Sequence, residues 1–386
     1  MDDKNLKIAF LSTSYKAKSE VWIWKQIQYL KPFIAFIGVQ QSVNYGTHEK
    51  IPLINLLEPQ NIFKRILDKI KNKNLKTYQL KRNILSAEKR YPFNAFYIHY
   101  LTQAYELRKV LLKSKKRIFI HCHGYDVSWS LRSLKFPFNN VYDKSYIGFA
   151  LEIQNKAIFI ANSNFTKKNL LSIGINKARI KVLKFGVGTA VSSKKKMGSS
   201  KIRYFYLGRL VDCKGPHLTI EAFNMVCDMG LNAELIIAGD GPLMTTCRLL
   251  RNKSKYKRKI KILGEISSER VEALFKICHI FTAHNITGEL THQTEAYGVS
   301  ILEAMANGLP VVTGRSGGVV ETVKDGKCGY LFSPGNIKEH AKKLFELGSN
   351  NELRERMGNF AIEYVQNNFS SEAEKRKLFD ILDISS

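Results

Sequence analysis

Short apolar runs alternate with stretches of helical spacing along most of the chain. Runs of about four to eight apolar residues are typical of strands buried on both faces, whereas apolar residues at i, i+3 and i+4 indicate an amphipathic helix. The predicted strands are Lys7–Leu11, Pro32–Val39, Arg117–Ile120, Ala157–Ala161, Ile180–Leu183, Ile202–Leu207, Glu234–Ala238, Ile260–Leu263, Ile280–Ala283 and Pro310–Thr313; the predicted helices are Ser19–Leu30, Pro216–Cys227, Ser268–Ile277 and Val299–Ala306. This alternation predicts an α/β protein whose parallel sheets carry helices on both faces.

One polar segment divides the chain into two parts. Residues 191–200 consist mainly of Ser, Lys and Gly, which is the composition of a linker. A chain of 386 residues is long enough for two domains of about 100–200 residues each. We therefore predict a first domain over 1–190, a linker over 191–200, a second domain over 201–366 and a C-terminal helix over 367–386.

The charge is concentrated in the first half. The chain has 61 basic and 33 acidic residues, of which residues 1–190 hold 33 basic and 11 acidic ones. Such a surface attracts a polyanion, either nucleic acid or anionic lipid headgroups, unless it is simply a solvated Lys-rich surface. The stretch Ile62–Arg90 has basic residues among apolar ones at near-helical spacing. It is predicted either to lie on a membrane surface or to be an ordinary surface helix docked on the sheet.

Other features narrow the class of protein. No apolar stretch approaches the roughly 18–20 residues needed to span a bilayer, and the N-terminus has neither a basic n-region nor an apolar h-region. The six cysteines are scattered without a C-x-x-C pair, so we expect reduced thiols in a cytosolic protein and no structural zinc.

The most informative segment runs from Glu295 to Val312. Gly298 lets the backbone approach a ligand, and the helix that begins at Val299 and Ser300 offers free N–H groups and a dipole that favour a phosphate. Glu303 follows just over one turn later, where a carboxylate can accept hydrogen bonds from two ribose hydroxyls. Glu295 precedes the helix and can reach the sugar end of such a ligand.

This segment resembles the donor-site signature of the retaining glycosyltransferases of family 4, which have the GT-B fold. The carrying pattern is Glu-x7-Glu followed by Ala-Met-Ala-x-Gly-x-Pro-Val-Val. Further pieces match in order: Gly208-Arg209-Leu210 with Lys214-Gly215 (diphosphate segment), Gly239–Pro242, Leu263–Ile266 (base-contacting loop) and Gly317–Leu331. The match is specific over about residues 200–345 and looser before them. Ser19-Glu20 before the first helix is similar to the colanic-acid and exopolysaccharide transferases.

The resemblance implies two Rossmann-like domains that face each other across a cleft, with a C-terminal helix that crosses back to the first domain. It assigns the donor to the second domain and the acceptor to the first. The implied donor-binding residues are Gly208, Arg209, Lys214, Gly239, Ile266, Tyr297, Gly298, Val299, Ser300 and Glu303. The implied catalytic residues are His123, Glu295, Arg209 and Lys214.

Two fixed cations suit this chemistry, because a departing nucleoside diphosphate gains negative charge that Arg209 and Lys214 can stabilise. The resemblance therefore implies no metal and no other cofactor. In the first domain, His121, His123, Gly124 and Asp126 end a strand, where sites form in open α/β sheets. The alternatives there are a structural strand end or a metal site, although no third ligand for His121 and His123 is apparent. The resemblance implies that His123 faces the donor sugar, and we expect His121, Gly124 and Asp126 on the acceptor side.

Three departures from the family pattern stand out. Ser12–Ser19 has no Gly, although the family usually has a Gly-Gly loop there that touches the donor phosphate. Ala283-His284 replaces the usual Pro-Ser. Ala296 stands where Gly is frequent, and its methyl group is expected to tighten the sugar pocket.

Together these features predict a retaining, metal-independent hexosyltransferase that uses a UDP- or GDP-sugar. The basic first half favours a lipid-linked or cell-surface glycan acceptor of bacterial polysaccharide biosynthesis, and a peripheral position on the cytoplasmic face of an anionic plasma membrane. The alternatives are a GT-B enzyme with a soluble acceptor or sugar-nucleotide substrate, of the epimerase or glucan synthase type, and a basic nucleic-acid-binding protein. The chain lacks zinc-finger spacing, an RRM motif and a basic zipper, so no nucleic-acid partner is expected.

Overall fold

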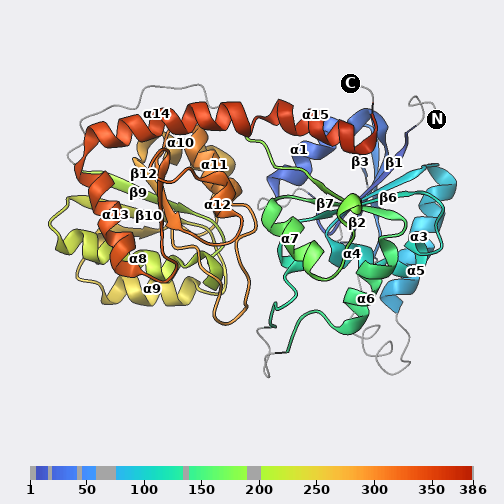
Figure 1. Ribbon diagram of the computed structural model, residues 1–386, viewed down its shortest axis with the longest axis horizontal. Coiled ribbons are helices and arrows are strands. Elements are labelled where there is room, and N and C mark those ends of the chain that lie inside the picture. Colours follow the sequence, from blue (N-terminus) through green and yellow to red (C-terminus); the bar gives the residue numbers. More distant parts are fainter. Residues whose placement is uncertain are drawn as a thin grey trace.

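The protein forms two lobes, each built around one β-sheet (Figure 1). The computed structural model describes residues 6–15, 20–40, 46–57, 75–133, 139–188 and 201–384. The expected linker 191–200 lies outside the described residues, as do Ser19 and the part of the basic stretch that precedes Leu75.

The first sheet has eight strands in the order β3-β4-β2-β1-β5-β6-β7-β8, and only β3 runs antiparallel to its neighbour. The strand order reverses at β1, where α/β sheets open a crevice at the carboxyl ends of their strands. The strands are β1 Ile8–Ser12, β2 Ile34–Val39, β3 Gly46–His48, β4 Ile51–Asn55, β5 Ala95–His99, β6 Arg117–Cys122, β7 Ala157–Ala161 and β8 Ile180–Val182. The helices are α1 Val21–Leu30, α3 Leu75–Arg90, α4 Leu101–Glu106, α5 Arg108–Leu111, α6 Lys144–Ile153 and α7 Asn164–Ser172.

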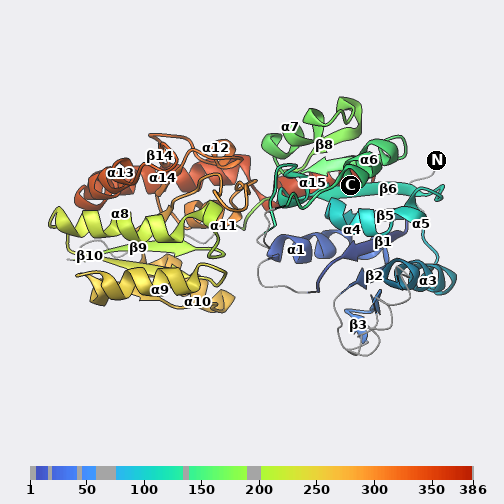
Figure 2. The same ribbon diagram turned by 90° about the horizontal axis from the view of Figure 1, so that it is seen from below.

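The second sheet has six parallel strands in the order β11-β10-β9-β12-β13-β14, and its order reverses at β9. Its helices lie on both faces, as Figure 2 shows. The strands are β9 Ile202–Leu207, β10 Ala233–Ala238, β11 Ile260–Ile262, β12 Ile280–Ala283, β13 Val311–Gly314 and β14 Gly329–Phe332. The helices are α8 Pro216–Asp228, α9 Met244–Lys253, α10 Ser268–Ile277, α11 Val299–Ala306, α12 Val319–Thr322, α13 Ile337–Ser349 and α14 Asn351–Asn368.

The predicted α/β architecture of two Rossmann-like units is confirmed. Both sheets are buried between helices, so their strands are apolar on both faces; Phe10 and Phe96 are fully buried in the first domain, and Phe205 and Phe281 in the second. Each such side chain stabilises the fold by about 1.5–3 kcal/mol through burial. The elements additional to the predicted ones are strands β3, β4, β5 and β14 and helices α4, α5, α6, α7, α9, α12, α13 and α14.

The final helix, α15 (Ser371–Leu382), leaves the second domain and lies on the first (Figure 1). It packs beside α1, where the Tyr29 hydroxyl donates to the Ser371 carbonyl at 3.0 Å. At its far end the Arg117 guanidinium donates to the Asp383 carboxylate at 2.6 Å. The predicted return of the C-terminal segment to the first domain is confirmed.

The chain passes between the domains twice, and the two passes lie side by side. We call the contact of Phe185–Val187 with Phe369–Ser371 the crossing point. There the Val187 N–H donates to the Phe369 carbonyl at 2.9 Å. A Cβ atom at Gly186 would lie only 2.3 Å from the Ser370 carbonyl oxygen, so this approach requires glycine.

Replacing Gly186 with Ala should destabilise the protein, because the new methyl group would overlap the Ser370 carbonyl. Overpacking of this kind costs about 1–3 kcal/mol. Gly148→Ala is the matched control: it adds the same methyl group to helix α6 with nothing within 4 Å, and should stabilise by up to about 1 kcal/mol. Thermal unfolding of both variants checks this, and equal effects would contradict tight packing at the crossing point.

Candidate active site

Helix α11 begins directly after the loop that carries Glu295. Gly298 caps it with a φ of 85°, a left-handed conformation that favours glycine. The Glu295 carboxylate turns back on this loop and accepts from the N–H groups of Tyr297 at 3.4 Å and Gly298 at 3.2 Å. Its second oxygen lies 3.0 Å from the Lys214 ammonium.

The Glu295–Lys214 pair is an ion pair with little solvent contact. Burial alone would raise the pKa of Glu295, but the Lys214 ammonium and the two backbone N–H groups outweigh it and lower that pKa below its usual value. Burial would likewise lower the pKa of Lys214, but Glu295 raises it. Both groups are therefore charged at neutral pH, and a fixed cation stands at the start of helix α11.

Glu303 lies one turn inside α11 and is held differently. Burial raises its pKa to about 7, against the smaller opposing effects of the Lys25 and Lys214 ammonium groups. Its carboxylate makes no hydrogen bond to any part of the chain that the structure describes. A half-buried carboxylate of this kind gains most when a ligand donates hydrogen bonds to it.

Glycine brings together the loops after β9 and β10. Gly208 has a φ of 158°, at the edge of extended backbone, and Gly239 has a φ of 132°. A Cβ atom at Gly239 would lie 2.0 Å from the Gly208 carbonyl oxygen. Arg209 follows Gly208 and has an exposed side chain. The Lys214 Nζ lies 3.4 Å from the position that a Cβ atom at Gly208 would take. Ile266, half-buried, lies in the loop after β11 at the same edge of the sheet.

Asp212 holds the long polar loop that precedes Glu295. Its carboxylate accepts from the N–H groups of Leu290 at 3.2 Å and Thr291 at 3.0 Å, and from the Thr291 hydroxyl at 2.8 Å. Because Asp212 is two residues before Lys214, this contact ties the loop to the segment that carries the cation. This role of Asp212 is not recognisable from the sequence beyond that spacing.

In the first domain, Asp126 shapes the end of strand β6. It is fully buried, and its carboxylate accepts from the N–H groups of His123 at 2.9 Å, Gly124 at 2.9 Å and Leu101 at 2.8 Å. Burial raises the pKa of Asp126 to about 6, against the lowering effect of these bonds. Asp126 thus orients the His123–Gly124 loop through its backbone N–H groups, and its own carboxylate is buried rather than exposed to solvent.

His121 and His123 point the same way, as strand alternation predicts, and their ring centres are 4.4 Å apart. The third imidazole that was not apparent from the sequence is supplied by His99. His99, at the end of the adjacent strand β5, places its Nδ1 2.9 Å from the His123 Nε2, and ring nitrogens of all three lie within 4.8 Å of one another. Burial lowers the pKa of each imidazole, so all three are neutral at pH 7.

Aromatic rings enclose His123. Phe185 stacks on it with ring centres 5.7 Å apart and an interplanar angle of 7°, and Tyr100 packs at 4.5 Å. Tyr100 has a φ of 74°, which is a strained conformation for a residue with a bulky side chain. That backbone directs the Tyr100 hydroxyl to Glu20, which accepts from it at 2.6 Å.

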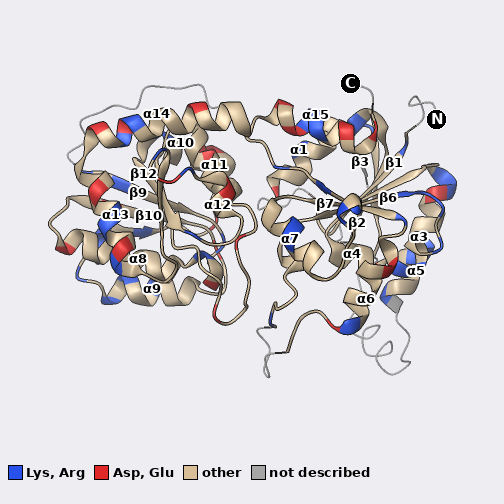
Figure 3. Ribbon diagram, in the orientation of Figure 1, with Lys and Arg blue, Asp and Glu red and all other residues tan. Residues whose placement is uncertain are grey.

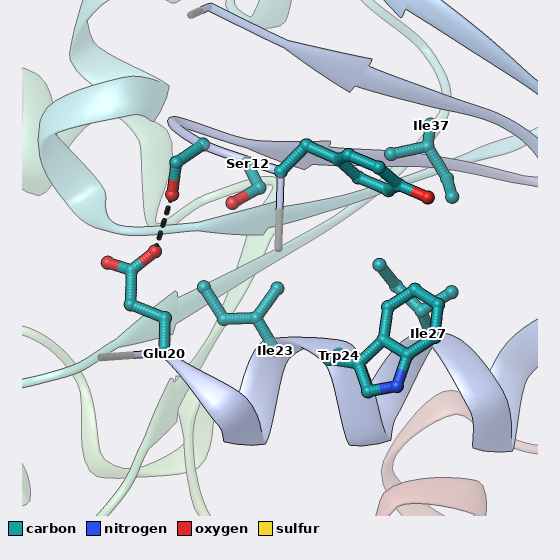
Figure 4. Close-up of a pocket in the computed structure, with 8 residues that line it drawn as sticks. Ser12, Glu20, Ile23, Trp24, Ile27 and Ile37 are labelled. Atoms are coloured by element: carbon teal, nitrogen blue, oxygen red, sulfur yellow. Dashed lines mark hydrogen bonds between the residues drawn. The ribbon is translucent and has the colours of Figure 1, made fainter. Parts of the chain in front are cut away.

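Glu20 closes one end of a small pocket between α1 and the strands of the first sheet (Figure 4). Its second oxygen accepts from the Ser14 hydroxyl at 2.7 Å. The rest of the wall is mainly apolar and includes Ile23, Trp24 and Ile37. The pocket therefore joins a carboxylate to an apolar surface at the carboxyl end of strand β1.

The two halves of the site meet at Gly124 and Ala296. A Cβ atom at Gly124, whose φ is 120°, would lie 2.2 Å from the Cβ of Ala296. A second contact holds the domains nearby: the Glu321 carboxylate accepts from the N–H groups of Asn164 at 2.9 Å and Phe165 at 2.7 Å. Because Ala296 follows Glu295, the His123 loop lies against the Glu295 loop.

One expected donor residue is placed differently from the others. The Tyr297 side chain is buried, and its hydroxyl donates to the Phe185 carbonyl at 2.8 Å, so only its N–H is directed at Glu295. Val299 and Ser300 are half-buried in the first turn of α11, as expected. Lys25, His99, Tyr100 and Asp212 join the site although the sequence did not single them out.

The second domain matches a known family. Residues 190–364 match the family model "Glycosyl transferases group 1". The chain is 25% identical over 281 residues, 70% of each chain, to a GDP-mannose-dependent alpha-(1-6)-phosphatidylinositol monomannoside mannosyltransferase of Mycobacterium tuberculosis. It is 26% identical over 226 residues, 55% of each chain, to the capsular polysaccharide biosynthesis glycosyltransferase CapM of Staphylococcus aureus. It spans about half the length of most of the curated relatives it matches.

The fold is that of known GT-B glycosyltransferases. The crystal structure of Anabaena HepE in complex with UDP and glucose superposes with a TM-score of 0.77, covering 98% of this chain and 100% of that one at 18% identity. The predicted GT-B fold is thereby confirmed.

Replacing Glu303 with Gln should make the protein more stable at alkaline pH. The pKa of Glu303 is about 7 in the folded protein, against 4.5 for the free side chain. This raised pKa contributes stability that is fully present below pH 4.5 and is lost as the pH rises through 7. At pH 8 the wild type keeps a half-buried charge that the amide lacks, a difference of about 1–2 kcal/mol after allowance for solvent contact. Thermal unfolding at pH 5 and pH 8 checks this; an advantage of the variant at pH 5 only would contradict it.

Proposed function

We propose that the protein transfers a hexosyl unit from a UDP- or GDP-sugar to a hydroxyl group, because residues 190–364 match the group 1 glycosyltransferase family. The observation that carries the proposal is the fixed pair of Lys214 and Glu295 at the start of helix α11, with Glu303 one turn further. A cation, a helix N-terminus and a free carboxylate in this order match the diphosphate and ribose of a nucleotide donor.

The donor contacts follow from chemistry. The diphosphate lies against Arg209, Lys214 and the N–H groups that open α11, and the ribose hydroxyls donate to Glu303. A charged hydrogen bond of that kind contributes about 1.5–3 kcal/mol. Since Arg209 and Lys214 stabilise the departing diphosphate, the proposed reaction needs no metal and no cofactor.

The sugar lies where the two domains meet, between the His123 loop and the Glu295 loop. Of the three imidazoles, His123 alone retains measurable exposure, 9%. Its Nδ1 is buried and has no partner among the described residues. A neutral imidazole there binds a sugar hydroxyl without repelling an oxocarbenium-like transition state. We propose that the leaving phosphate deprotonates the acceptor on the same face, giving retention, so that Glu295 is not a covalent nucleophile.

The proposed acceptor is a lipid-linked or cell-surface glycan of bacterial polysaccharide biosynthesis, reached from the cytoplasmic face of the membrane. Helix α3 supports this, because it lies on the outer side of the first lobe (Figure 3) and its Lys81, Arg82, Lys89 and Arg90 are exposed. Tyr78, Arg82, Leu85 and Lys89 follow one stripe of that helix, with Tyr78 64% and Leu85 42% exposed. Exposed apolar groups among cations suit a surface of anionic headgroups.

The other face of α3 packs on the first domain through Leu80, Ile84 and Ala87. The helix is therefore a docked surface helix that also carries a basic stripe on its exposed face. No helix in the described part of the chain has the length and apolar character needed to cross a membrane.

Replacing Lys214 with Ala should lower kcat for donor hydrolysis by about 100–1000-fold, because the ammonium acts on charge that develops on the leaving group. Turnover of a panel of UDP- and GDP-sugars by the wild type identifies the donor for this assay. Lys255→Ala is the control, since Lys255 is an exposed lysine of the same domain paired with Asp228. A folded, fully active Lys214→Ala variant, or no turnover of any donor by the wild type, would contradict the proposal.

The protein should sediment with vesicles rich in phosphatidylglycerol at low salt and less so as salt rises. Each basic residue near such a surface contributes about 1 kcal/mol, so changing Lys81, Arg82, Lys89 and Arg90 to Gln should weaken binding at least about tenfold. The control removes four charges from the second domain: Lys253, Lys255, Lys257 and Arg258 to Gln. Equal losses in both variants, or no binding by the wild type, would favour a soluble acceptor.

A further inference from the structure

A buried carboxylate on the crossing helix begins a chain of hydrogen bonds. Glu374, in α15, has a fully buried side chain. One oxygen accepts from the Gly186 N–H at 3.0 Å and lies 2.7 Å from the Lys25 ammonium. The other oxygen accepts from the Gln26 amide at 3.0 Å. Three donors surround it, so Glu374 is the accepting end of the chain.

The direction of every following bond is then fixed. A carboxylate only accepts, so Gln26 must turn its NH₂ group to Glu374 and its Oε1 the other way. That oxygen accepts from the Tyr97 hydroxyl at 2.8 Å. The Tyr97 hydroxyl donates its single proton to Gln26, so at the 3.1 Å contact with His121 it must accept from Nδ1.

This order selects one tautomer of His121. Burial lowers the pKa of His121 to about 3, so the ring is neutral at pH 7 and carries one N–H. That proton is on Nδ1, and Nε2 keeps a bare lone pair with no partner among the described residues.

We infer that Glu374 is a positioning residue, which fixes the tautomer and ring of His121 through Gln26 and Tyr97 and thereby places His123. The tautomer follows from the hydrogen bonds alone, whereas the effect on turnover rests on the function proposed above.

Both arms of the Glu374 carboxylate lead to His123. Along one arm, the His121 ring packs against His123 with centres 4.4 Å apart. Along the other, Gly186 follows Phe185, whose ring stacks on His123. The Phe185 carbonyl also accepts from Tyr297, in the loop of Glu295. Glu374 therefore connects the crossing point to the groups on both sides of the proposed sugar site.

The isosteric variant Glu374→Gln gives a sharp test, because it should reverse the chain. Lys25 and the Gly186 N–H need an acceptor, so the new amide turns its oxygen to them and its NH₂ to Gln26. Gln26 then turns its oxygen to the new amide and its NH₂ to Tyr97, and the phenol donates to Nδ1 of His121. The predicted tautomer changes from Nδ1–H to Nε2–H.

Long-range ¹H–¹⁵N correlation spectra of ¹⁵N-histidine-labelled full-length protein report this directly, with His121→Asn to assign the signal. We expect Nδ1–H in the wild type and Nε2–H in Glu374→Gln, together with an about tenfold lower kcat for donor hydrolysis and a donor KM within about twofold. Tyr29→Phe is the matched control. It removes the hydroxyl that binds the same helix at Ser371, without touching the chain, and should change neither readout.

Tyr97→Phe serves as a second variant should Glu374→Gln fold poorly; it removes the fixing acceptor and should leave a mixture of both tautomers. An Nε2–H signal in the wild type, or an unchanged signal in both Glu374→Gln and Tyr97→Phe, would overturn the inference. A changed tautomer with unchanged kcat would overturn the positioning role. The spectra need no turnover, so a wild type that acts on no nucleotide-sugar would refute the proposed function while the tautomer remains testable.

Discussion

The two domains touch at the site where Gly124 packs against the methyl group of Ala296, and this contact depends on residues with little or no side chain. The loop of Glu295 and Ala296 is enclosed by Gly124 from the first domain and by Gly317 and Gly318 from its own. A Cβ atom at Gly318 would lie 1.8 Å from the Ala296 carbonyl oxygen. A side chain at any of these glycines would displace the loop. The Glu295–Lys214 pair and the start of α11 are built on that loop, so their geometry follows from the same packing.

The two sides of the site differ in charge. The second domain presents ions, a fixed cation and two carboxylates, whereas the first presents three buried neutral imidazoles and aromatic rings. This division suits a bond that breaks with charge separation. In the reaction proposed above, the negative leaving group would depart toward the Lys214 cation, and the sugar would face the neutral His123 ring on the side of the first domain.

Much of the second domain could be predicted from the sequence, because its signals are local. The segment from Glu295 to Glu303 has its functional groups within nine residues, and the fold places Lys214, which belongs to a second local motif, against Glu295. The first domain was harder, because its contacts are distant in sequence. His99 meets His123 only since β5 and β6 are neighbours, and no spacing reveals which strands pair. The return of α15 to the first domain was expected, but Glu374 beneath α1 was not, because its partners are about 190 and 350 residues away.

Glu321 has a consequence for how the domains separate. Helix α7 of the first domain has its free N-terminal N–H groups at Asn164 and Phe165 satisfied by this carboxylate of the second. A helix normally carries its own cap, and Ser163 provides only part of one here. When the domains move apart, α7 is left with bare donors and Glu321 with a bare charge. Separation of the domains at this contact and fraying of the α7 N-terminus are therefore coupled, because water would have to solvate both the N–H groups and the carboxylate.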